Sequence, residues 1–584
     1  MGQGAQAAEF RERGFARRSE FLDRMLWVTG ENAREGYIRL HRPELDRFLS
    51  LVTRLNAEDS GLKVINTSLQ RKGLLLKITS EIQQIAQLSN DPELAELGTA
   101  LAEARKDLAS LTLSGPTAET QGRHTQVLYE LEQQVNELQG ELGRASVRYK
   151  SSIAQISVDQ LAEVLEEETV LVDFLAYADG DQQKLVAGIL KKEGGEVSSS
   201  MIVYDSMQEI EEIVLEYRTY IQDEDADEDE ILEMGQLAYE KIWLPLEEAI
   251  GEIEHVYLVP DGILNILPFN ALVDEEEGYL IQNLDLQILT SGRDLLPNSY
   301  RLAEGNYVIL AGPDYDSEDV VSQEEIQQAQ GRRSTALQLG LRSGASGLRG
   351  LNFNPLPGAE QEGRLITDQV QQNEKSSEVY FKENAQEQIL SNLTEPPEIL
   401  HMATHGFFLK ADDTLRRRLL KSQRSAEQIV PPPGDNPLLR SGMAFAGINT
   451  NAQFLGDIDT VNDGVLTALE VLELNLTGTK LVVLSACETG LGEIHEGEGV
   501  YGLRRSFQEA GVAEVISSLW EVSDAGTQAL MTDLYDRILA GAPARQALRA
   551  TQLAMMDSPE WGYPYIWSAF MIVGSYESAG YALQ

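Results

Sequence analysis

The first 150 residues carry apolar positions at the three-and-four spacing of amphipathic helices, and no segment among them alternates like a strand. Asn90-Asp91-Pro92 predicts a helix start, because Asp caps helices and Pro fits a first helical turn. A turn is expected at Ser114-Gly115-Pro116, between two stripes that we expect to pair as an antiparallel helical hairpin. Residues 1–155 therefore form an all-α region, and a packed helical scaffold is its simplest interpretation. The two stripes are Leu94, Leu97, Leu101, Leu108 and Leu111, and Leu128, Leu131, Val135, Leu138 and Leu142.

Beyond residue 160 the hydrophobic period changes from that of helices to that of strands. Short apolar runs rich in Val, Ile and Leu alternate with helical segments, which predicts an α/β fold with a mainly parallel sheet covered on both faces by helices. Two helices are expected after the last of these runs. The predicted strands are Thr169–Tyr177, Leu185–Leu190, Met201–Tyr204, Val256–Pro260, Tyr307–Leu310, Glu398–Thr404, Lys480–Ser485 and Glu514–Leu519, with a helix from about Val500 to Ala510.

Residues 311–355 are rich in Gly, Ser, Arg and Gln, and we interpret them as a flexible connection. They divide the α/β part into a first lobe at 165–310 and a second lobe at 356–578. Asp223–Glu230 carries seven acids in eight residues, which predicts a solvated loop; a metal site is not expected without turn glycines.

The charge is strongly acidic: 47 Lys plus Arg face 94 Asp plus Glu, for a net charge of -47 across 584 residues. Such a surface repels a phosphate backbone, which argues against nucleic acid and favours a basic polypeptide as partner. No apolar run is long enough to span a bilayer, and Met1–Phe15 lacks the apolar core of a secretion signal. The single cysteine, Cys487, excludes an intrachain disulfide and fits a reducing compartment, so we expect a cytoplasmic protein.

Two of the predicted strands end in residues that can carry chemistry. One ends His401-Met402-Ala403-Thr404-His405-Gly406, and the other ends Ser485-Ala486-Cys487. Sites in open α/β sheets form at the carboxyl ends of strands, and an imidazole within reach favours the thiolate that acts as nucleophile. His405 is the expected base, and the backbone N–H groups of Gly406 and Cys487 could form an oxyanion hole. The pattern predicts acyl transfer.

Several simpler alternatives stay open at this point. A free cysteine is commonly a buried core residue, and a lone histidine is commonly satisfied by hydrogen bonds. His401 and His405 could share a metal with Cys487, although no fourth ligand has suitable spacing. His495, in the loop after Cys487, is a competing general base that we rank below His405, because we expect that loop to be mobile.

A second motif competes with the His–Cys pair. Residues 497–502 read Gly-Glu-Gly-Val-Tyr-Gly, which satisfies GxGxxG before a predicted helix, and Glu521 follows about 20 residues on. This pattern would bind a dinucleotide. However, its first glycine lies a dozen residues after the preceding strand, and Glu498 would place negative charge against a pyrophosphate.

The same residues resemble the CHAT family, the caspase and HetF associated domain of caspase-like cysteine peptidases that is often joined to tetratricopeptide repeats. The resemblance spans roughly residues 165–578. It rests on Val259–Leu272 (VPDGILNILPFNAL), Leu356–Glu362 (LPGAEQE), Leu400–Phe408 (LHMATHGFF), Pro437–Asn449 (PLLRSGMAFAGIN), Leu481–Gly492 (LVVLSACETGLG), Gly497–Phe507 (GEGVYGLRRSF), Ser517–Asp524 (SSLWEVSD) and Tyr563–Gly574 (YPYIWSAFMIVG).

This resemblance implies a caspase-like fold whose dyad is His405 and Cys487, without cofactor or metal, and a protein substrate. Members of this group often prefer a basic residue before the cleaved bond. The first lobe resembles a second caspase-like lobe without a dyad of its own. Residues up to 150, including Arg71-Lys72-Gly73, are similar to the region that follows the repeats, although no 34-residue array is evident here. The helical region would then serve sensing, or docking of an activating partner.

Two finer expectations concern specificity and control. The acidic charge and the segment after the strand at 514–519 predict an acidic specificity pocket; the candidates are Asp524, which we favour, Glu521 and Trp520. Asp524 could instead cap the helix that starts there. The irregular insert from Lys410 to Asp463 is a candidate gate, because its basic residues Arg416, Arg417, Arg418, Lys421 and Arg424 could lie across an acidic cleft or be cut there. A catalytically silent scaffold of the same fold remains the main alternative.

Overall fold

The computed structural model places most of the chain and describes it with side chains. The described ranges are 3–88, 91–114, 121–147, 156–296, 301–317, 352–409, 437–451, 463–486, 489–490, 492–495 and 499–575.

The N-terminal region is helical throughout its described part, as the apolar spacing predicted. Asp91 begins α5 as expected, because its Oδ1 accepts a hydrogen bond from the backbone N–H of Glu93 at 3.0 Å. The two leucine-rich stripes face each other as α5 packs against α6, which confirms the predicted hairpin. Most of the expected turn between them lies outside the described residues. The helices are α1 (Gln3–Trp27), α2 (Glu31–Leu55), α3 (Ser60–Arg71), α4 (Leu74–Leu88), α5 (Pro92–Ser114), α6 (Gln121–Ser146) and α7 (Val158–Val164).

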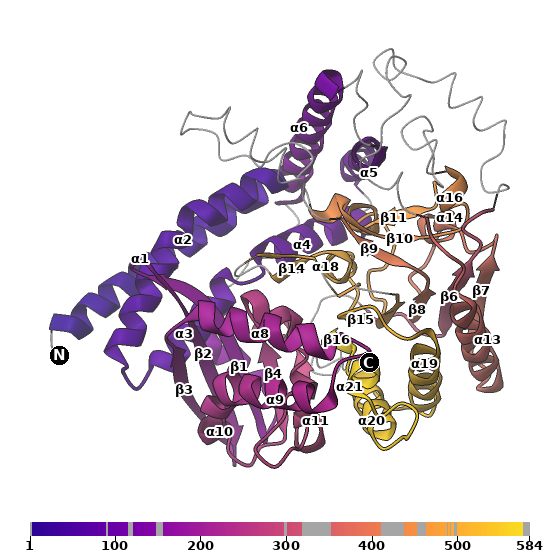
Figure 1. The fold of residues 1–584 in the computed structure, drawn as a ribbon. Helices are drawn as coiled ribbons and strands as arrows, with labels where there is room; N and C mark the ends of the chain where they lie inside the picture. The colour runs from indigo at the N-terminus through magenta and orange to yellow at the C-terminus, as the bar shows by residue number, and fades with distance from the viewer. Residues whose placement is uncertain are drawn as a thin grey trace.

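One large sheet runs through the rest of the molecule (Figure 1). Its eleven strands follow the order β3-β2-β1-β4-β5-β16-β15-β12-β8-β6-β7, and the pairings are parallel except at β1–β2, β2–β3 and β15–β16. The strands are β1 (Thr169–Asp179), β2 (Gln182–Glu193), β3 (Glu196–Tyr204), β4 (His255–Val259), β5 (Asp285–Ile288), β6 (Asn306–Pro313), β7 (Ser376–Lys382), β8 (Ile399–Ala403), β12 (Leu481–Ser485), β15 (Glu514–Ser518) and β16 (Phe570–Gly574).

Helices cover both faces of this sheet, as the alternating pattern predicted. In β12, Val483 packs with α13, α19 and α20, whereas Val482 and Leu484 pack with α4, α5 and α18 on the opposite face. The predicted α/β fold with a mainly parallel sheet, preceded by an all-α region, is therefore confirmed. The covering helices are α8 (Met207–Ile221), α9 (Glu228–Ala238), α10 (Leu244–Ile250), α13 (Pro357–Gln372), α17 (Ala468–Val471), α18 (Leu503–Glu509), α19 (Asp524–Leu539), α20 (Ala544–Met556) and α21 (Pro564–Trp567).

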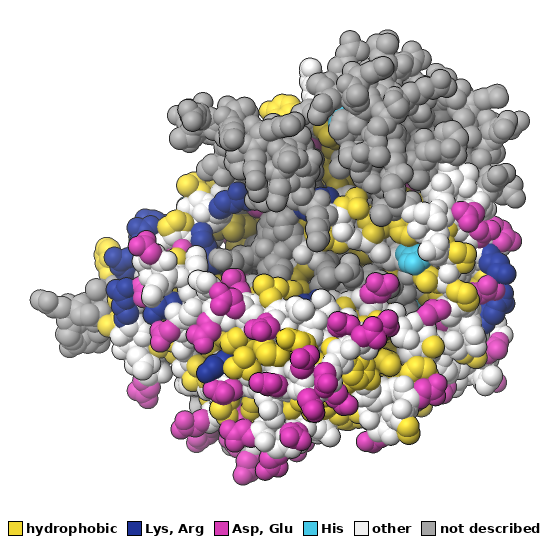
Figure 2. Space-filling view, in the orientation of Figure 1, with side chains coloured by type: hydrophobic (Ala, Val, Ile, Leu, Met, Phe, Trp, Pro, Cys, Tyr) yellow, Lys and Arg dark blue, Asp and Glu magenta, His cyan; other side chains and the backbone are white. Residues whose placement is uncertain are grey.

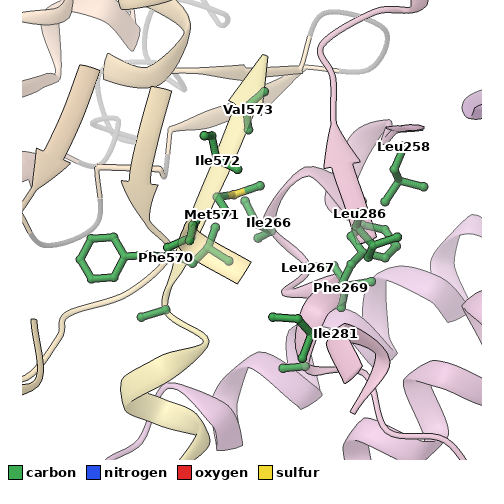
Figure 3. Close-up of a cluster of buried hydrophobic side chains, with 14 of the residues drawn as sticks. Leu258, Ile266, Leu267, Phe269, Ile281, Leu286, Phe570, Met571, Ile572 and Val573 are labelled. Carbon is green, nitrogen blue, oxygen red and sulfur yellow. The ribbon is translucent and has the colours of Figure 1, made fainter. Parts of the chain in front are cut away.

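The two halves of the sheet meet at β5 and β16, where the paired register is a single position, Ile288 with Val573. Side-chain packing supplies most of the contact at this junction (Figure 3). Ile266, Leu267 and Phe269, from the loop after β4, lie between β16 and the first half of the sheet. The labelled cluster is Leu258, Ile266, Leu267, Phe269, Ile281, Leu286, Phe570, Met571, Ile572 and Val573.

Two expectations about chain segments are corrected by the fold. The boundary expected at residue 310 falls within β6, which pairs with β7 and β8 and so belongs to the second half of the sheet. The acidic run at 223–230 is not all loop, since Asp227 caps α9 by accepting from the backbone N–H of Asp229, and its last three acids form the first helical turn. Carboxylates at a helix N-terminus are stabilised by the helix dipole.

A buried lysine connects the N-terminal helices to the first half of the sheet by an ion pair and hydrogen bonds. Lys72, between α3 and α4, lies 3.1 Å from Asp173 and donates to the carbonyls of Phe174 at 2.7 Å and Val259 at 3.0 Å. Burial raises the pKa of Asp173, while the ammonium of Lys72 opposes that shift. Lys72 thus binds at the carboxyl end of β4 and at the middle of β1, where Asp173 is paired with Val259.

The surface carries the strong net charge unevenly. Exposed acidic side chains spread over α8 and α9 in the lower part of Figure 2, while arginines gather at the left edge over α1 and α2. Within the described part of the chain, no helix is both long enough and apolar enough to cross a membrane.

Candidate functional site

The two strands that end in candidate catalytic residues are neighbours in the sheet. β8 and β12 pair in parallel with Ala403 opposite Ser485, and the backbone N–H of Thr404 donates to the carbonyl of Ser485 at 3.3 Å. His405 follows directly at the carboxyl end of β8. Cys487 lies outside the described residues, two positions along the chain from Ser485.

The imidazole of His405 is held by a backbone carbonyl. Its Nε2 lies 2.8 Å from the carbonyl oxygen of Asn354, and the rings of Tyr315 and Phe353 stand 5.3 and 5.5 Å away. A carbonyl only accepts hydrogen bonds, so Nε2 carries the proton and Nδ1 is left as the basic nitrogen. The same carbonyl stabilises the imidazolium once Nδ1 is protonated. This is the arrangement that a general base requires.

The chain before His405 is fixed by a buried hydroxyl. Thr404 donates from Oγ1 to the carbonyl of Ala444, and its Oγ1 lies 2.9 Å from the hydroxyl of Tyr315. These contacts join β8 to the small sheet beside it, of order β11-β10-β9, whose strands are β9 (Gly406–Phe408), β10 (Ser441–Ala444) and β11 (Val465–Thr467). The insert that we expected to be irregular contributes β10 here. Its residues 410–436 lie outside the described residues, and with them the basic residues of the candidate gate, Arg416, Arg417, Arg418, Lys421 and Arg424.

Gly406 begins β9 with its N–H directed away from β10. Ala444 donates to the carbonyl of His405, and Leu409 donates to the carbonyl of Arg440, so the odd-numbered residues of β9 make the hydrogen bonds of this antiparallel pair. Because β9 is the edge strand, the N–H of Gly406 points out of the small sheet. This orientation suits an oxyanion-hole donor.

A buried carboxylate connects the two strands that carry the candidate residues, below their carboxyl ends. Glu362 of α13 lies with Oε1 2.9 Å from Nε2 of His401 on β8, and its Oε2 accepts from the hydroxyl of Ser485 on β12 at 3.1 Å. Nδ1 of His401 lies 3.1 Å from the hydroxyl of Tyr535. His401 is fully buried in this network, whereas His405 is partly exposed beyond the strand. The two histidines therefore have different surroundings. Within the described residues, no group of three or more His, Cys, Asp or Glu side chains is arranged to hold a metal ion.

The three residues considered for specificity sit in different surroundings. Trp520 is buried, and its indole N–H donates to the carbonyl of Tyr565 at 3.0 Å, so its ring belongs to the core. Glu521 and Asp524 are exposed. The helix cap is Ser523, which accepts from the N–H of Gly526.

Asp524 contacts a second helix instead of capping its own. Its Oδ2 accepts from the N–H of Gly358 at 2.9 Å, in the first turn of α13. The carboxylate thus lies where the N-termini of α13 and α19 meet, and both helix dipoles favour negative charge there.

The competing base and the glycine motif lie on a short hairpin and its surroundings. His495 lies on β13 (Glu493–His495), which pairs with β14 (Gly499–Tyr501), so the loop after Cys487 contains a hairpin. Gly497 and Glu498 lie outside the described residues. The rest of the GxGxxG run enters α18 from β14, an antiparallel strand outside the main sheet, and the βαβ unit of a dinucleotide site is not formed there.

Two buried carboxyl groups, those of Glu387 and Asp463, lie close to the half-buried carboxyl group of Glu470. Burial, reinforced by the charge of Glu470, raises the pKa of Asp463 to about 7, and burial also raises the pKa values of Glu387 and Glu470. Asp463 accepts from the N–H of Val465 at 2.9 Å, at the start of β11. The folded state therefore favours a protonated Asp463.

We expect Asp463→Asn to raise the unfolding temperature more at pH 8 than at pH 5. The folded pKa of Asp463 lies above its ordinary value of 3.8, so the wild type loses stability as the pH rises from about 4 to about 7. Asn stays neutral and can still accept from Val465. Thermal unfolding at both pH values, with exposed Asp557→Asn as control, measures this; an equal change at both pH values would contradict the buried-carboxyl explanation.

The sequence singled out His405 as a candidate but gave no indication of the residues that hold its ring. Asn354 contacts His405 through its backbone carbonyl, which every residue type carries, so the sequence cannot indicate it. Asn449 contacts the backbone of the neighbouring Phe353. Glu362 and Asn449 both lie within motifs that carried the family resemblance, which is the signal that could have singled them out.

Comparison with known proteins gives one family and several distant structures. The CHAT domain model matches residues 232–575. Gingipain R, the Arg-specific cysteine proteinase RgpB, matches at 10% identity with a TM-score of 0.29, over 63% of this chain and 74% of that chain; the complex of Porphyromonas gingivalis RgpB pro- and mature domains gives 10%, 0.30, 63% and 76%. The Saccharomyces cerevisiae separase–securin complex matches at 10% identity with a TM-score of 0.39, over 97% of this chain and 40% of that chain. No protein with a curated description matches the sequence.

Proposed function

Because the chain belongs to the CHAT domain family, we propose that it is a cysteine endopeptidase in which His405 is the general base and Cys487 the nucleophile. One observation supports this most strongly. At the end of β8, next to β12, His405 has its Nε2 proton engaged by the carbonyl of Asn354, which leaves Nδ1 as the basic nitrogen.

The proposed reaction follows from these groups. Nδ1 of His405 takes the proton of the Cys487 thiol, and the thiolate adds to the carbonyl carbon of the substrate peptide bond. The N–H groups of Gly406 and Cys487 donate to the oxyanion of the tetrahedral intermediate. The amine leaves with the proton from His405, and water then hydrolyses the thioester. No cofactor or metal takes part in this proposal.

We further propose that the substrate is a protein cut after a basic residue. The supporting observations are the net charge of -47 and the exposed carboxylate of Asp524 near the end of β15. A carboxylate pairs well with guanidinium in a partly desolvated pocket.

For this specificity we expect Asp524→Asn to lower reactivity toward an Arg-containing peptide electrophile by roughly tenfold, with little change toward its norleucine counterpart. Glu521→Gln is the matched control and should alter neither rate. Labelling rates for both probes give the result. An equal loss of labelling rate with both probes would mean that Asp524 only holds Gly358 at the start of α13. A wild-type preference for Asp or apolar residues before the cleaved bond would exclude the acidic pocket.

Control by a partner on the N-terminal helices is also part of the proposal. Gln83 of α4 donates to the carbonyl of Leu472 at 2.5 Å, and buried Arg105 of α5 forms an ion pair with Glu473, just after α17. α4 also packs on α18, the helix that follows the loop after Cys487. A partner bound to these helices is therefore connected to the catalytic half by direct packing. We place the protein in the cytoplasm, on its cysteine content.

Thiol-reactive peptide electrophiles give the direct test of the enzyme class. A peptidase should be labelled at Cys487 by a probe carrying Arg, and competing peptide should slow the labelling. Wild-type protein that is folded but unreactive, with or without candidate partners, would favour a catalytically silent scaffold. Proteomic comparison of cleaved proteins between wild type and Cys487→Ala would then identify the substrate.

A further inference from the structure

A short segment, the strap (residues 352–355), lies against His405 just before α13 begins. Its Asn354 supplies the carbonyl at 2.8 Å from Nε2, and the ring of Phe353 stands among those of Tyr315, His405 and Phe407. Asn354 itself is exposed. The position of the carbonyl therefore depends on what holds Phe353.

The side chain of Asn449 holds the backbone of Phe353 on both sides. Its Oδ1 accepts from the N–H of Phe353 at 2.9 Å, and its Nδ2 donates to the carbonyl of the same residue at 2.9 Å. This reciprocal pair fixes the place and the orientation of the two peptide units that flank Phe353. The next carbonyl along the chain is that of Asn354.

Asn449 is in turn anchored to the turn after β6. Its backbone N–H donates to the carbonyl of Tyr315 at 2.9 Å, and its Nδ2 also donates to Oδ1 of Asp316 at 2.9 Å. Gly447 donates to the carbonyl of Asp314 at 3.0 Å. The amide thus joins the strap to a part of the fold that packs directly on the ring of His405.

We propose that Asn449 is a positioning residue that holds the Asn354 carbonyl on Nε2 of His405 and thereby keeps Nδ1 as the basic nitrogen. The inference rests on the proposed function. Without Asn449 the carbonyl moves away, the imidazole exchanges between tautomers, and the imidazolium loses a hydrogen-bond acceptor. The base weakens, and the Cys487 thiolate, which the imidazolium stabilises, forms less readily.

The single cysteine of the chain makes this testable without a substrate, because alkylation by iodoacetamide reports on Cys487 alone. Alkylation rates as a function of pH give the thiolate pKa of wild type, His405→Ala, Asn449→Ala and Asn449→Asp. We expect both Asn449 variants to raise this pKa and to slow alkylation near pH 6 by roughly fivefold. Thr450→Ala is the matched control: its hydroxyl donates to the carbonyl of Asp316 at 3.1 Å without contacting the strap, and its profile should equal that of wild type.

A second readout excludes a merely structural role. The ring ¹⁵N shifts of His405, assigned with His405→Gln, should show the Nε2-protonated tautomer in wild type and in Thr450→Ala, and a mixture in the Asn449 variants. Asn449→Asp retains the acceptor for Phe353 and serves if the alanine variant does not fold.

The outcomes separate the two proposals. If His405→Ala leaves the thiolate pKa unchanged, the dyad itself is wrong and the inference fails with it. If His405→Ala raises that pKa while folded Asn449 variants match wild type in alkylation and ring shifts, the proposed function stands and the role of Asn449 is overturned.

Discussion

Replacing Cys487 or His405 with Ala is expected to abolish cleavage of any protein that the wild type cuts, by roughly four orders of magnitude or more for each variant. The double variant should be no worse, because a nucleophile and its base act as one unit. Both variants should stay folded, since His405 is partly exposed and neither change removes a core side chain that the structure describes. Turnover of an identified substrate, with unfolding temperature measured in parallel, checks this.

The matched control is His495→Ala, which should retain normal turnover. Normal turnover by folded His405→Ala would contradict the assignment of the base and would make His495 the candidate. Loss of activity in His405→Ala alone, with Cys487→Ala still active, would mean that another group is the nucleophile.

Glu362→Ala should be the most destabilising of the single changes considered, by about 3–5 kcal/mol. The change leaves the buried imidazole of His401 and the hydroxyl of Ser485 without their shared carboxylate, and neither group can reach water. Thermal and denaturant unfolding give the magnitude. Activity should fall with it, because the lost contacts join β8 and β12 just below the positions proposed as catalytic.

The control for this change lies on the same helix. Glu360, two residues earlier, makes a partly exposed ion pair with Arg364 at 2.7 Å, and its replacement by Ala should cost no more than about 0.5 kcal/mol. Glu362→Gln should fall between the two, since it keeps the shape but loses the charge. A Glu362→Ala protein as stable as Glu360→Ala would show that the buried network contributes nothing to the fold.

The central strands were predictable because burial on both faces requires them to be continuous apolar runs. β12 and β15 are fully buried, and the predicted ranges fit them within a residue. β7 was missed because it is an edge strand whose residues are exposed or half-buried, and because it begins with three polar residues. β9, β10 and β11 have three or four residues each, too short to show a period.

The site was predictable only where it depends on residue type at a strand end. That rule singled out His405 and Gly406 as candidates. It could not find the carbonyl of Asn354, 51 positions before His405, because a backbone group leaves no mark in the sequence and long-range placement needs the fold. Residues 311–355 were predicted to be a flexible connection, so the sequence did not predict that Asp314–Ser317 and the strap lie together beside His405.

The order in which the chain leaves the ribosome has a consequence at β16. This strand lies between β5 and β15 in the sheet, yet it is the last strand of the sheet to be synthesised. Between the end of β5 and the start of β16 there are 281 residues. Until then the nascent chain holds two half-sheets, each with an unpaired inner edge and an uncovered share of the cluster around Phe570 and Ile572. Such edges pair readily with other chains. Protection of these edges during synthesis is therefore a requirement of this topology.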